Sequence, residues 1–374
     1  MDREYAEELK KIEAILVEFL PAVPNTFWCN RVFPLPGLKA EAAEALLAPG
    51  RELFLRGGKR WRPLLAHLLC RALGGGDAAL PLLPLVEFTH NASLIHDDLE
   101  DNSDERRGKP AIHLIYGSDT AINSGSFFYF LPLIVLENFS GDAEDKNHLW
   151  QLWARHIRFL HLGQSMDIAW HRNAALIPSV DDYLLMCRLK TGALARFAAL
   201  LGIEAARISL KNANPPKNQG GAELEALMEP LGEAAQKLGV GFQILDDVKN
   251  LSAGIPGKKR GDDVVEGKKS LPVLLFLHLE DSKETNNGEM NTREERANFV
   301  ERCFRTAGER GADIPEVEEF ITALTGTGVL KEAEIRGKTL ISEAGTVFSS
   351  LKAVNSEAGR LLAGFSELLG NAES

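Results

Sequence analysis

Helical periodicity is the feature of this chain that most restricts its fold. Apolar residues recur at steps of three and four through long stretches, which is typical of amphipathic helices. The clearest examples are AEELKKIEAILVEFL, KAEAAEALLAPGREL, LWQLWARHIRFLHLGQSMDIAW and LEALMEPLGEAAQKLGVGFQILDDV. The apolar–polar alternation of β-strands is almost absent. The sequence therefore predicts an all-α fold, built as a single helical bundle.

Turn-forming residues separate the helical stretches. Loops are expected at Gly74–Gly76, Asn212–Gly221, Gly254–Gly261 and Asp281–Thr292. Helical periodicity resumes directly after each loop, so none of them resembles a linker between domains. We therefore expect one domain over the whole chain, which at 374 residues is long enough to bury a sizeable core.

Composition restricts the partners and the compartment. The chain carries 42 Lys and Arg against 53 Asp and Glu, a net charge of −11, which argues against nucleic acid as the main partner. Four scattered cysteines without a CxxC pair do not form a disulfide framework, which fits a reducing compartment such as the cytoplasm. The N-terminus is charged and unlike a signal peptide. The apolar run Ser126–Leu136 is too short to span a bilayer.

An acidic cluster follows one of the apolar runs, in LIHDDLEDNSDERRG. On a helix over Leu82–Asp101, the carboxylates of Asp97, Asp98 and Asp101 fall within about a quarter of the circumference. Carboxylates at this spacing repel one another, so they need a compensating cation. Glu100 lies outside this face and is not expected to be a ligand. Asp104, which follows the helix end, is likewise not expected to bind metal.

A second cluster repeats the pattern with Asp246, Asp247 and Asn250 in FQILDDVKN. Either cluster alone is also what a solvated acidic helix end looks like. Two clusters at matching spacing, both after apolar runs, favour a metal site. Mg²⁺ prefers oxygen ligands and typically joins one or two carboxylates to substrate phosphates. Two such helices facing each other would hold a diphosphate through bridging Mg²⁺.

Basic residues complete the pattern, although each basic set alone is typical of a solvated surface. They are Lys59, Arg60 and Arg62; Arg106, Arg107 and Lys109; Lys190 beside the hydroxyl of Thr191; and Lys258, Lys259, Lys268 and Lys269. Four such sets in an acidic chain suggest a site for two anionic groups. His90 lies on the helix face of Asp97, and Gln243 precedes Asp246 by one turn, although either residue alone is typical of a satisfied polar residue in a core.

Six motifs occur in order between Arg56 and Pro272: GGKRWRP, DDLEDNSDERRGKPAIH, GQSMD, KTGAL, FQILDDVKN and GDDVVEGKKSLP. They resemble the motifs of the trans-isoprenyl diphosphate synthases, or polyprenyl synthetases. DDLEDNS, AINSGSFFYF and LHLGQSMDIAW are most similar to the eukaryotic-type geranylgeranyl diphosphate synthases. The resemblance implies an isoprenoid-synthase bundle around a central cavity over residues 1–374. The motifs occupy about 50–275, between N-terminal helices (1–50) and C-terminal helices (276–374).

The resemblance also assigns residue roles, matched position by position. It implies a catalytic set of Asp97, Asp98, Asp101, Lys190 and Asp246, with Asp97, Asp101 and Asp246 as the Mg²⁺ ligands. The allylic diphosphate is held by Arg106, Lys190, Thr191, Gln243, Lys258 and Lys268. Isopentenyl diphosphate is held by Lys59, Arg62, His90 and Arg107. Gln164 and Asp167 match a motif lining the same cavity. Asn250 stands where many members have aspartate, which weakens its assignment as a ligand.

The implied reaction is a Mg²⁺-dependent condensation of isopentenyl diphosphate with an allylic diphosphate, head to tail and in trans, releasing diphosphate. The resemblance implies three Mg²⁺ ions with substrate bound, replaceable by Mn²⁺, and a homodimer that acts on small molecules. Small residues at Ala92 and Ser93 suggest a deep tunnel and geranylgeranyl diphosphate as product. Phe127, Phe128 and Tyr129 are expected to form its lower floor.

Three other functions are compatible with parts of the pattern. A class I terpene cyclase also uses an aspartate-rich motif, but it does not need the GGKRWRP set. A metal-dependent phosphohydrolase would use His90 with His96 and Asp97, although the remaining histidines form no matching pattern. An inactive subunit of a heteromeric synthase would have lost aspartates or basic residues that are all present here.

Overall fold

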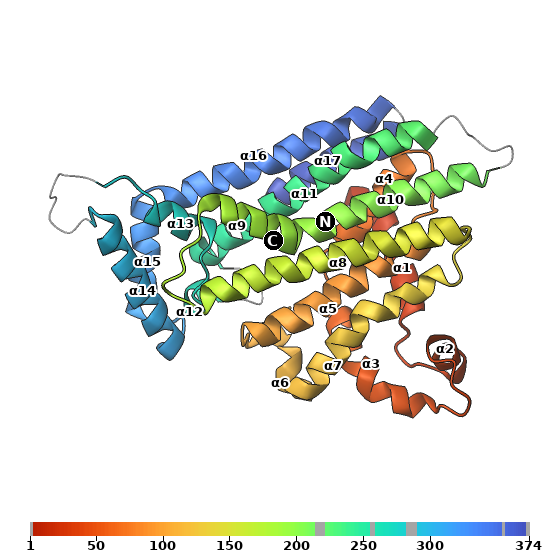
Figure 1. The fold of residues 1–374 in the computed structure, drawn as a ribbon, viewed down its shortest axis with the longest axis horizontal. Helices are drawn as coiled ribbons and strands as arrows, with labels where there is room; N and C mark the ends of the chain where they lie inside the picture. The colour runs from red at the N-terminus through yellow and green to blue at the C-terminus, as the bar shows by residue number, and fades with distance from the viewer. Residues whose placement is uncertain (1–2, 214–220, 255–258, 282–289, 354–355, 372–374) are drawn as a thin grey trace. The chain divides into compact units, whose positions relative to one another are not determined.

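The computed structural model describes residues 3–213, 221–254, 259–281, 290–353 and 356–371 (Figure 1). Most of these residues are helical and very few are in strands, so the all-α prediction is confirmed. The Cα positions divide the chain into two compact units. The first comprises 1–157, 194–235 and 345–368, and the second comprises 158–193, 236–344 and 369–374.

Most helices belong to one unit. Those of the first unit are α1 (Ala6–Phe19), α2 (Thr26–Val32), α3 (Ala40–Leu55), α4 (Trp61–Ala72), α5 (Pro84–Glu100), α6 (Ile112–Tyr116) and α7 (Ser118–Phe130). Those of the second unit are α9 (Val180–Cys187), α12 (Asp262–Val265), α13 (Leu271–Leu277), α14 (Arg293–Arg310) and α15 (Pro315–Gly326). Five helices contribute residues to both: α8 (Ala143–His171), α10 (Ala193–Lys211), α11 (Gly221–Ser252), α16 (Val329–Ser349) and α17 (Ser356–Asn371).

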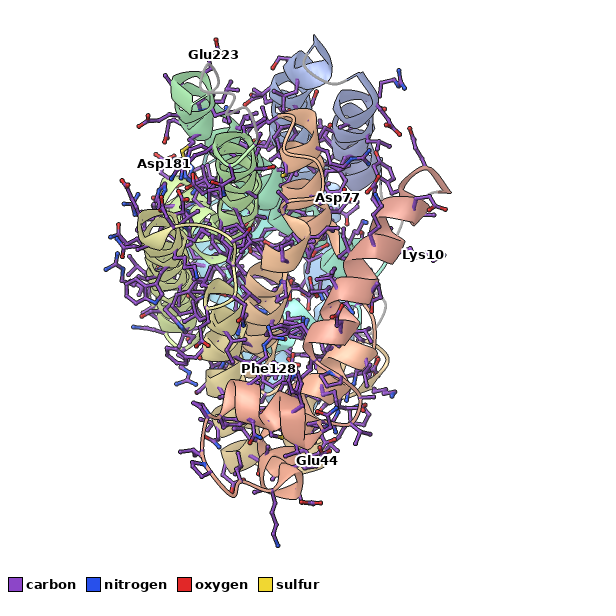
Figure 2. The ribbon with its side chains drawn as sticks, turned by 90° about the vertical axis from the view of Figure 1, so that its right-hand side faces the viewer. Lys10, Glu44, Asp77, Phe128, Asp181 and Glu223 are labelled. Atoms are coloured by element: carbon purple, nitrogen blue, oxygen red, sulfur yellow. The ribbon has the colours of Figure 1, made fainter. Side chains whose placement is uncertain are left out.

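Aromatic rings fill the core of the first unit, where α5 packs against α3 and α7 (Figure 1). The ring of Phe88 lies 5.1 Å from that of Phe19, 5.2 Å from that of Phe54 and 6.0 Å from that of Phe128. Phe128, labelled in Figure 2, is fully buried. A Cβ on Gly50 would lie 2.4 Å from its ring, so only glycine permits this approach of α3 to α7.

One stretch of the described chain, Ser118–Leu136, is long and apolar enough to cross a membrane by length and composition alone. It is longer than the run Ser126–Leu136 that the sequence marked, because it includes all of α7 and the 3₁₀ turns of Leu131–Leu136. Half of it is buried within the structure. Because α7 packs against α3 and α5, the core explains the buried half of this apolar stretch.

The second unit has its own core around α13. All seven residues of Leu271–Leu277 are buried, so this helix is apolar on every side, as expected for one enclosed by others. It packs against α9, α14 and α15. Asn212–Ala213 and Asp281 are described at the edges of two predicted loops, whereas 214–220, 255–258 and 282–289 lie outside the described residues.

A short hairpin departs from the sequence expectation. Strands β1 (Glu105–Arg106) and β2 (Lys109–Pro110) pair antiparallel, with Arg106 opposite Lys109. The two turn residues, Arg107 (φ 54°) and Gly108 (φ 74°), both adopt positive φ, which suits a tight two-residue hairpin. The RG dipeptide is the only local signal for it. The hairpin fixes where the paired arginines of the first acidic motif lie.

A buried charge network ties α8 to α10 in the first unit. Glu204 is fully buried and accepts hydrogen bonds from Arg207 Nε (3.0 Å) and His148 Nδ1 (3.1 Å). Burial raises the pKa of Glu204, but these hydrogen bonds outweigh it and lower the pKa to about 2. The hydrogen bond to Glu204 raises the pKa of His148. Buried Asp145 pairs with Arg207 from the other side.

Glu204→Gln is expected to destabilise the protein by about 3 kcal/mol near pH 5 to 6, because roughly two pKa units of depression are lost. The depressed pKa stabilises the folded state above the unfolded value of about 4.3, and this contribution disappears as the pH falls towards 2. The raised pKa of His148 contributes fully below about 6.5 and is lost as the pH rises through its folded value. Urea unfolding from about pH 2.5 to 8 measures both effects.

The control is Glu229→Gln, which removes an exposed ion pair with Arg196 and should change stability little. A Glu204→Gln penalty that stays constant down to about pH 2.5 would mean that the charge of Glu204 contributes nothing.

Candidate active site

The first acidic cluster lies at the C-terminal end of α5, as predicted. Asp101 caps the helix, and its N–H donates to the carbonyl of Asp97 at 2.9 Å. Asp97 and Asp101 are partly exposed, whereas Asp98 is fully buried. Arg106, on the hairpin, donates from Nε to Asp98 Oδ1 at 2.7 Å and lies 3.4 Å from Asp97 Oδ2. The three carboxylates therefore differ in access: Asp97 and Asp101 are partly exposed, and Asp98 is not.

The donors of this cluster fit a hard divalent cation. Burial raises the pKa of Asp98 to about 6; Arg106 opposes this, and the charges of Asp97 and Asp101 add to it. Asp98 Oδ2 is buried without a hydrogen-bond donor among the described residues. The described residues hold no group of three or more His, Cys, Asp or Glu arranged around one point. A Mg²⁺ ion bound by one or two carboxylates and a diphosphate needs no such group.

A positively charged cluster surrounds His90 on α5. Arg62 Nη1 donates to His90 Nε2 at 3.2 Å. Burial lowers the pKa of His90 well below its usual value, and the charges of Arg62, Arg107, Arg106 and Arg60 lower it further. A neutral imidazole among arginines leaves a strong positive field, which suits an anion such as a diphosphate.

The second glycine of GGKRWRP, Gly58, allows Arg107 to approach. Gly58 has φ +152°, and a Cβ there would lie 3.0 Å from Arg107 Nη2. Arg107 Nη1 in turn donates to the carbonyl of Leu53 at 3.1 Å, and burial lowers the pKa of Arg107 to about 10. Lys59 is exposed and lines a groove of about 860 Å³ together with α1. That participation of α1 has no signal in the sequence.

Two basic residues have structural roles instead. Arg60 is buried and donates to Glu87 Oε1 at 2.7 Å. Lys269 is also buried and donates to the carbonyls of Trp170 and Asn173, and burial lowers its pKa to about 8. Both belong to the basic sets that the sequence suggests for anionic groups, but each is bonded to other residues inside the fold.

The predicted chain-length residues lie one turn before the carboxylates. Ala92 is fully buried, and the Oγ of Ser93 donates to the carbonyl of His90 at 2.8 Å. His96 bonds through Nδ1 to the carbonyl of Ala92 at 3.1 Å and stacks on Tyr129 at 5.5 Å. A Cβ on Gly125 would lie 2.8 Å from His96 Cε1, so glycine makes room for this stack.

The three aromatic residues predicted as a floor point to different places. Phe128 packs in the core against Phe88, and Phe127 stacks on Phe33 at 5.5 Å. Tyr129 stacks on His96, and burial and the nearby charges of Glu100 and Asp97 raise its pKa. Of the three, Tyr129 is therefore the one that lies close to the first acidic cluster.

In the second unit a chain of hydrogen bonds links α9, α11 and the π-helical turn Arg188–Gly192. Thr191 Oγ1 donates to Gln243 Oε1 at 2.7 Å, and Gln243 Nε2 donates to Asp247 Oδ1 at 2.9 Å. Tyr183 donates to Asp247 Oδ2 at 2.6 Å. Burial raises the pKa of Asp247 to about 7, with a contribution from Asp263. Asp247 is thus held inside the fold, whereas Asp246 is partly exposed.

Lys190 projects from the π-helical turn, a distortion that is frequent at functional sites. Its Nζ donates to Asp167 Oδ2 at 2.6 Å. A Cβ on Gly163 would lie 2.4 Å from the backbone N of Lys190. The glycine of GQSMD therefore allows α8 to pass directly against the turn that carries Lys190.

The loop after the second cluster is only partly described. Lys258 lies outside the described residues, and Lys259 is exposed. Lys268 pairs with Glu266 and lies 3.9 Å from Asp263 Oδ1. Gln164 is partly exposed on α8.

The family model for polyprenyl synthetases matches residues 43–306, most of the chain and all six motifs. The chain belongs to the polyprenyl synthetase family. The geranylfarnesyl diphosphate synthase of Aeropyrum pernix is 30% identical to it over 318 residues, 83% of this chain and 89% of that protein. The geranylgeranyl pyrophosphate synthase of Eremothecium gossypii is 33% identical over 243 residues, 64% of this chain and 71% of that protein. This polyprenyl synthetase is thus a prenyltransferase of the isoprenyl diphosphate synthase type, as predicted.

Solved structures support the fold. The geranylgeranyl pyrophosphate synthetase of Pyrococcus horikoshii has a TM-score of 0.74 and 24% identity, and the likeness covers 98% of this chain and 97% of that one. A polyprenyl synthase of Caulobacter crescentus, solved with calcium and isoprenyl diphosphate, has a TM-score of 0.72 and 23% identity, covering 100% and 97%. At these identities the likeness shows the isoprenoid-synthase fold.

Proposed function

We propose that this polyprenyl synthetase condenses isopentenyl diphosphate with an allylic diphosphate and that geranylgeranyl diphosphate is its main product. The positive cluster around His90, formed with Arg62 and Arg107, is the observation that supports a second diphosphate substrate. A terpene cyclase, which takes one diphosphate, has no use for it. The names of relatives such as the Eremothecium enzyme support the product.

We propose Mg²⁺ as the cofactor, with Asp97 and Asp101 as its ligands in the first unit and Asp246 as a ligand in the second. When bound, it neutralises the charge that develops on the departing diphosphate. Lys190, whose Nζ lies 2.6 Å from Asp167 Oδ2, supplies a fixed ammonium for diphosphate oxygens. Arg106, paired here with Asp97 and Asp98, transfers its hydrogen bonds to the allylic diphosphate. The remaining residues orient the second diphosphate and exclude water that would quench the allylic cation.

Incubation with Mg²⁺, isopentenyl diphosphate and each allylic primer in turn tests the proposal. Elongated prenyl diphosphates are expected, with the C20 compound predominating. Allylic diphosphate alone should stay unchanged, whereas a cyclase would convert it to hydrocarbon. The absence of elongation with every primer would refute the proposed reaction.

Product length is expected to fall when Ser93 is replaced. Ser93 is partly exposed one turn before Asp97, so the ring of Ser93→Phe would occupy the space into which the chain grows. The expected product is mainly C15, measured by chromatography of the dephosphorylated alcohols. Ala92→Phe is the parallel variant, but Ala92 is fully buried and its ring must displace neighbours in the core. Product lengths unchanged in a folded Ser93→Phe enzyme would contradict this account of the floor.

We further propose a cytoplasmic homodimer that contacts neither nucleic acid nor the membrane interior. Large apolar side chains remain exposed on α6 and α7: Ile115, Ile122 and Phe130, the last at 63% exposure. A second copy would cover such a surface. Sedimentation at micromolar concentration gives the oligomeric state, and Phe130→Lys should shift it towards monomer.

A further inference from the structure

Asn250 connects α11 to the basic loop that follows it. Its side chain is buried at 1% exposure. Oδ1 accepts a hydrogen bond from the N–H of Asp263 at 3.1 Å, and the backbone carbonyl accepts from Gly261 at 3.0 Å. Nδ2 donates to the carbonyl of Lys259 at 3.5 Å. One residue thus bonds to three residues of the segment 259–263.

The hydrogen bond from Asp263 to Asn250 satisfies an N–H group at the N-terminus of the short helix α12. Helix N-termini leave N–H groups without partners inside the helix, and a polar side chain at the preceding position usually accepts from one of them. That position is Gly261, which has φ 86° and no side chain. The amide of Asn250, coming from a different helix, accepts from Asp263 in its place.

An amide suits this position better than a carboxylate. Asn250 both accepts from an N–H and faces the carbonyl oxygen of Lys259, which a carboxylate would repel. Asp247 and Asp263 are both buried. A third buried negative charge would add to the cost of burying them. Asparagine in place of aspartate therefore has a local physical reason.

Asp263, which Asn250 holds, is in turn bonded to Lys268, a proposed ligand of the allylic diphosphate. The N–H of Lys268 donates to the carbonyl of Asp263 at 2.9 Å, and its Nζ lies 3.9 Å from Asp263 Oδ1. We propose that Asn250 is a positioning residue: it holds Asp263, and through it Lys268, in place for the allylic diphosphate, and it does not bind metal. This inference rests on the proposed function for the role of Lys268.

Steady-state kinetics of Asn250→Leu test the inference. The KM for the allylic diphosphate should rise about tenfold, the equivalent of roughly one well-placed hydrogen bond. The KM for isopentenyl diphosphate should stay within about twofold, because none of its predicted ligands lies on α11 or α12. The Mg²⁺ concentration for half-maximal rate should also stay unchanged. Asn250→Asp retains the acceptor for Asp263 but places a buried charge against the Lys259 carbonyl, so it should recover the allylic KM only in part.

A metal ligand would behave differently, since Asn250→Leu would then raise the Mg²⁺ requirement and Asn250→Asp would lower it. Either result overturns the inference, as does an unchanged allylic KM in Asn250→Leu. Should Asn250→Leu fail to fold, Asn250→Asp and Asn250→Ser are compared with Lys268→Met in a double-mutant cycle. Strictly additive effects would show that Asn250 does not act through Lys268.

Two controls accompany the test. Ser252→Ala, on the same helix but exposed, should leave all constants unchanged. Wild-type prenyl transfer in the same assay separates this inference from the proposed function, since failure of the latter would abolish elongation in every variant.

Discussion

Asp97→Ala is expected to lower kcat by about a thousandfold while leaving the fold intact. Asp97 is partly exposed at the end of α5, so its loss removes little packing. The carboxylate is the predicted metal ligand, and metal stabilisation of a developing diphosphate charge contributes several kcal/mol. Asp101→Ala should behave alike. Single-turnover kinetics with saturating allylic diphosphate measure the chemical step directly.

The neighbouring residues provide the contrast. Asp104→Asn removes an exposed charge beyond the helix and should keep nearly full activity. Asp98→Ala should mainly lower thermal stability, because it leaves the Arg106 guanidinium without its closest carboxylate. High Mg²⁺ should partly restore Asp97→Ala if the loss lies in metal affinity. Equal activity of Asp97→Ala and Asp104→Asn would rule out Asp97 as a ligand.

The helices that carry the candidate site follow from the sequence, because apolar periodicity is a local property. The predicted helix Leu82–Asp101 corresponds to α5 with Asp101 as its cap. The differences in burial and partners among the three carboxylates do not follow from the sequence. Asp98 is buried because Arg106 reaches it from a hairpin whose turn depends on positive φ at Arg107 and Gly108. Sequence spacing places the three carboxylates on one face but carries no information on what covers that face.

The basic residues show the same limit. Arg60 and Lys59 are adjacent, yet Arg60 pairs with Glu87 inside the fold and Lys59 is exposed. Lys268 and Lys269 are also adjacent. Lys269 donates to the carbonyl of Trp170, about a hundred residues away in sequence, whereas Lys268 belongs to the predicted site. Burial of a charge depends on partners distant in sequence. A count of basic residues therefore overestimates the number available to substrate.

Lys190→Met should lower kcat by about two to three orders of magnitude with a smaller effect on KM. The Lys190 ammonium is held by Asp167 at 2.6 Å, and a fixed cation that acts on developing negative charge stabilises the transition state more than the ground state. Lys237→Met is the matched control, since Lys237 pairs with Glu343 at the surface of the same unit. A loss confined to KM would show that Lys190 only binds substrate.

Gly163→Ala tests whether the position of the Lys190 ammonium matters, because this variant keeps the lysine but displaces it. The added methyl would lie 2.4 Å from the Lys190 backbone N, a distance that no packing tolerates, so the π-helical turn must move. Because Lys190 itself is retained, any loss of kcat reports displacement, and misplacement by about 1 Å costs on the order of a hundredfold. Gly326→Ala, where a Cβ meets nothing within 4 Å, is the control. Unchanged kcat in Gly163→Ala would mean that the precise place of Lys190 does not matter to catalysis. A loss comparable to that of Lys190→Met would mean that the glycine of GQSMD is required because it lets the lysine of the next motif reach the substrate.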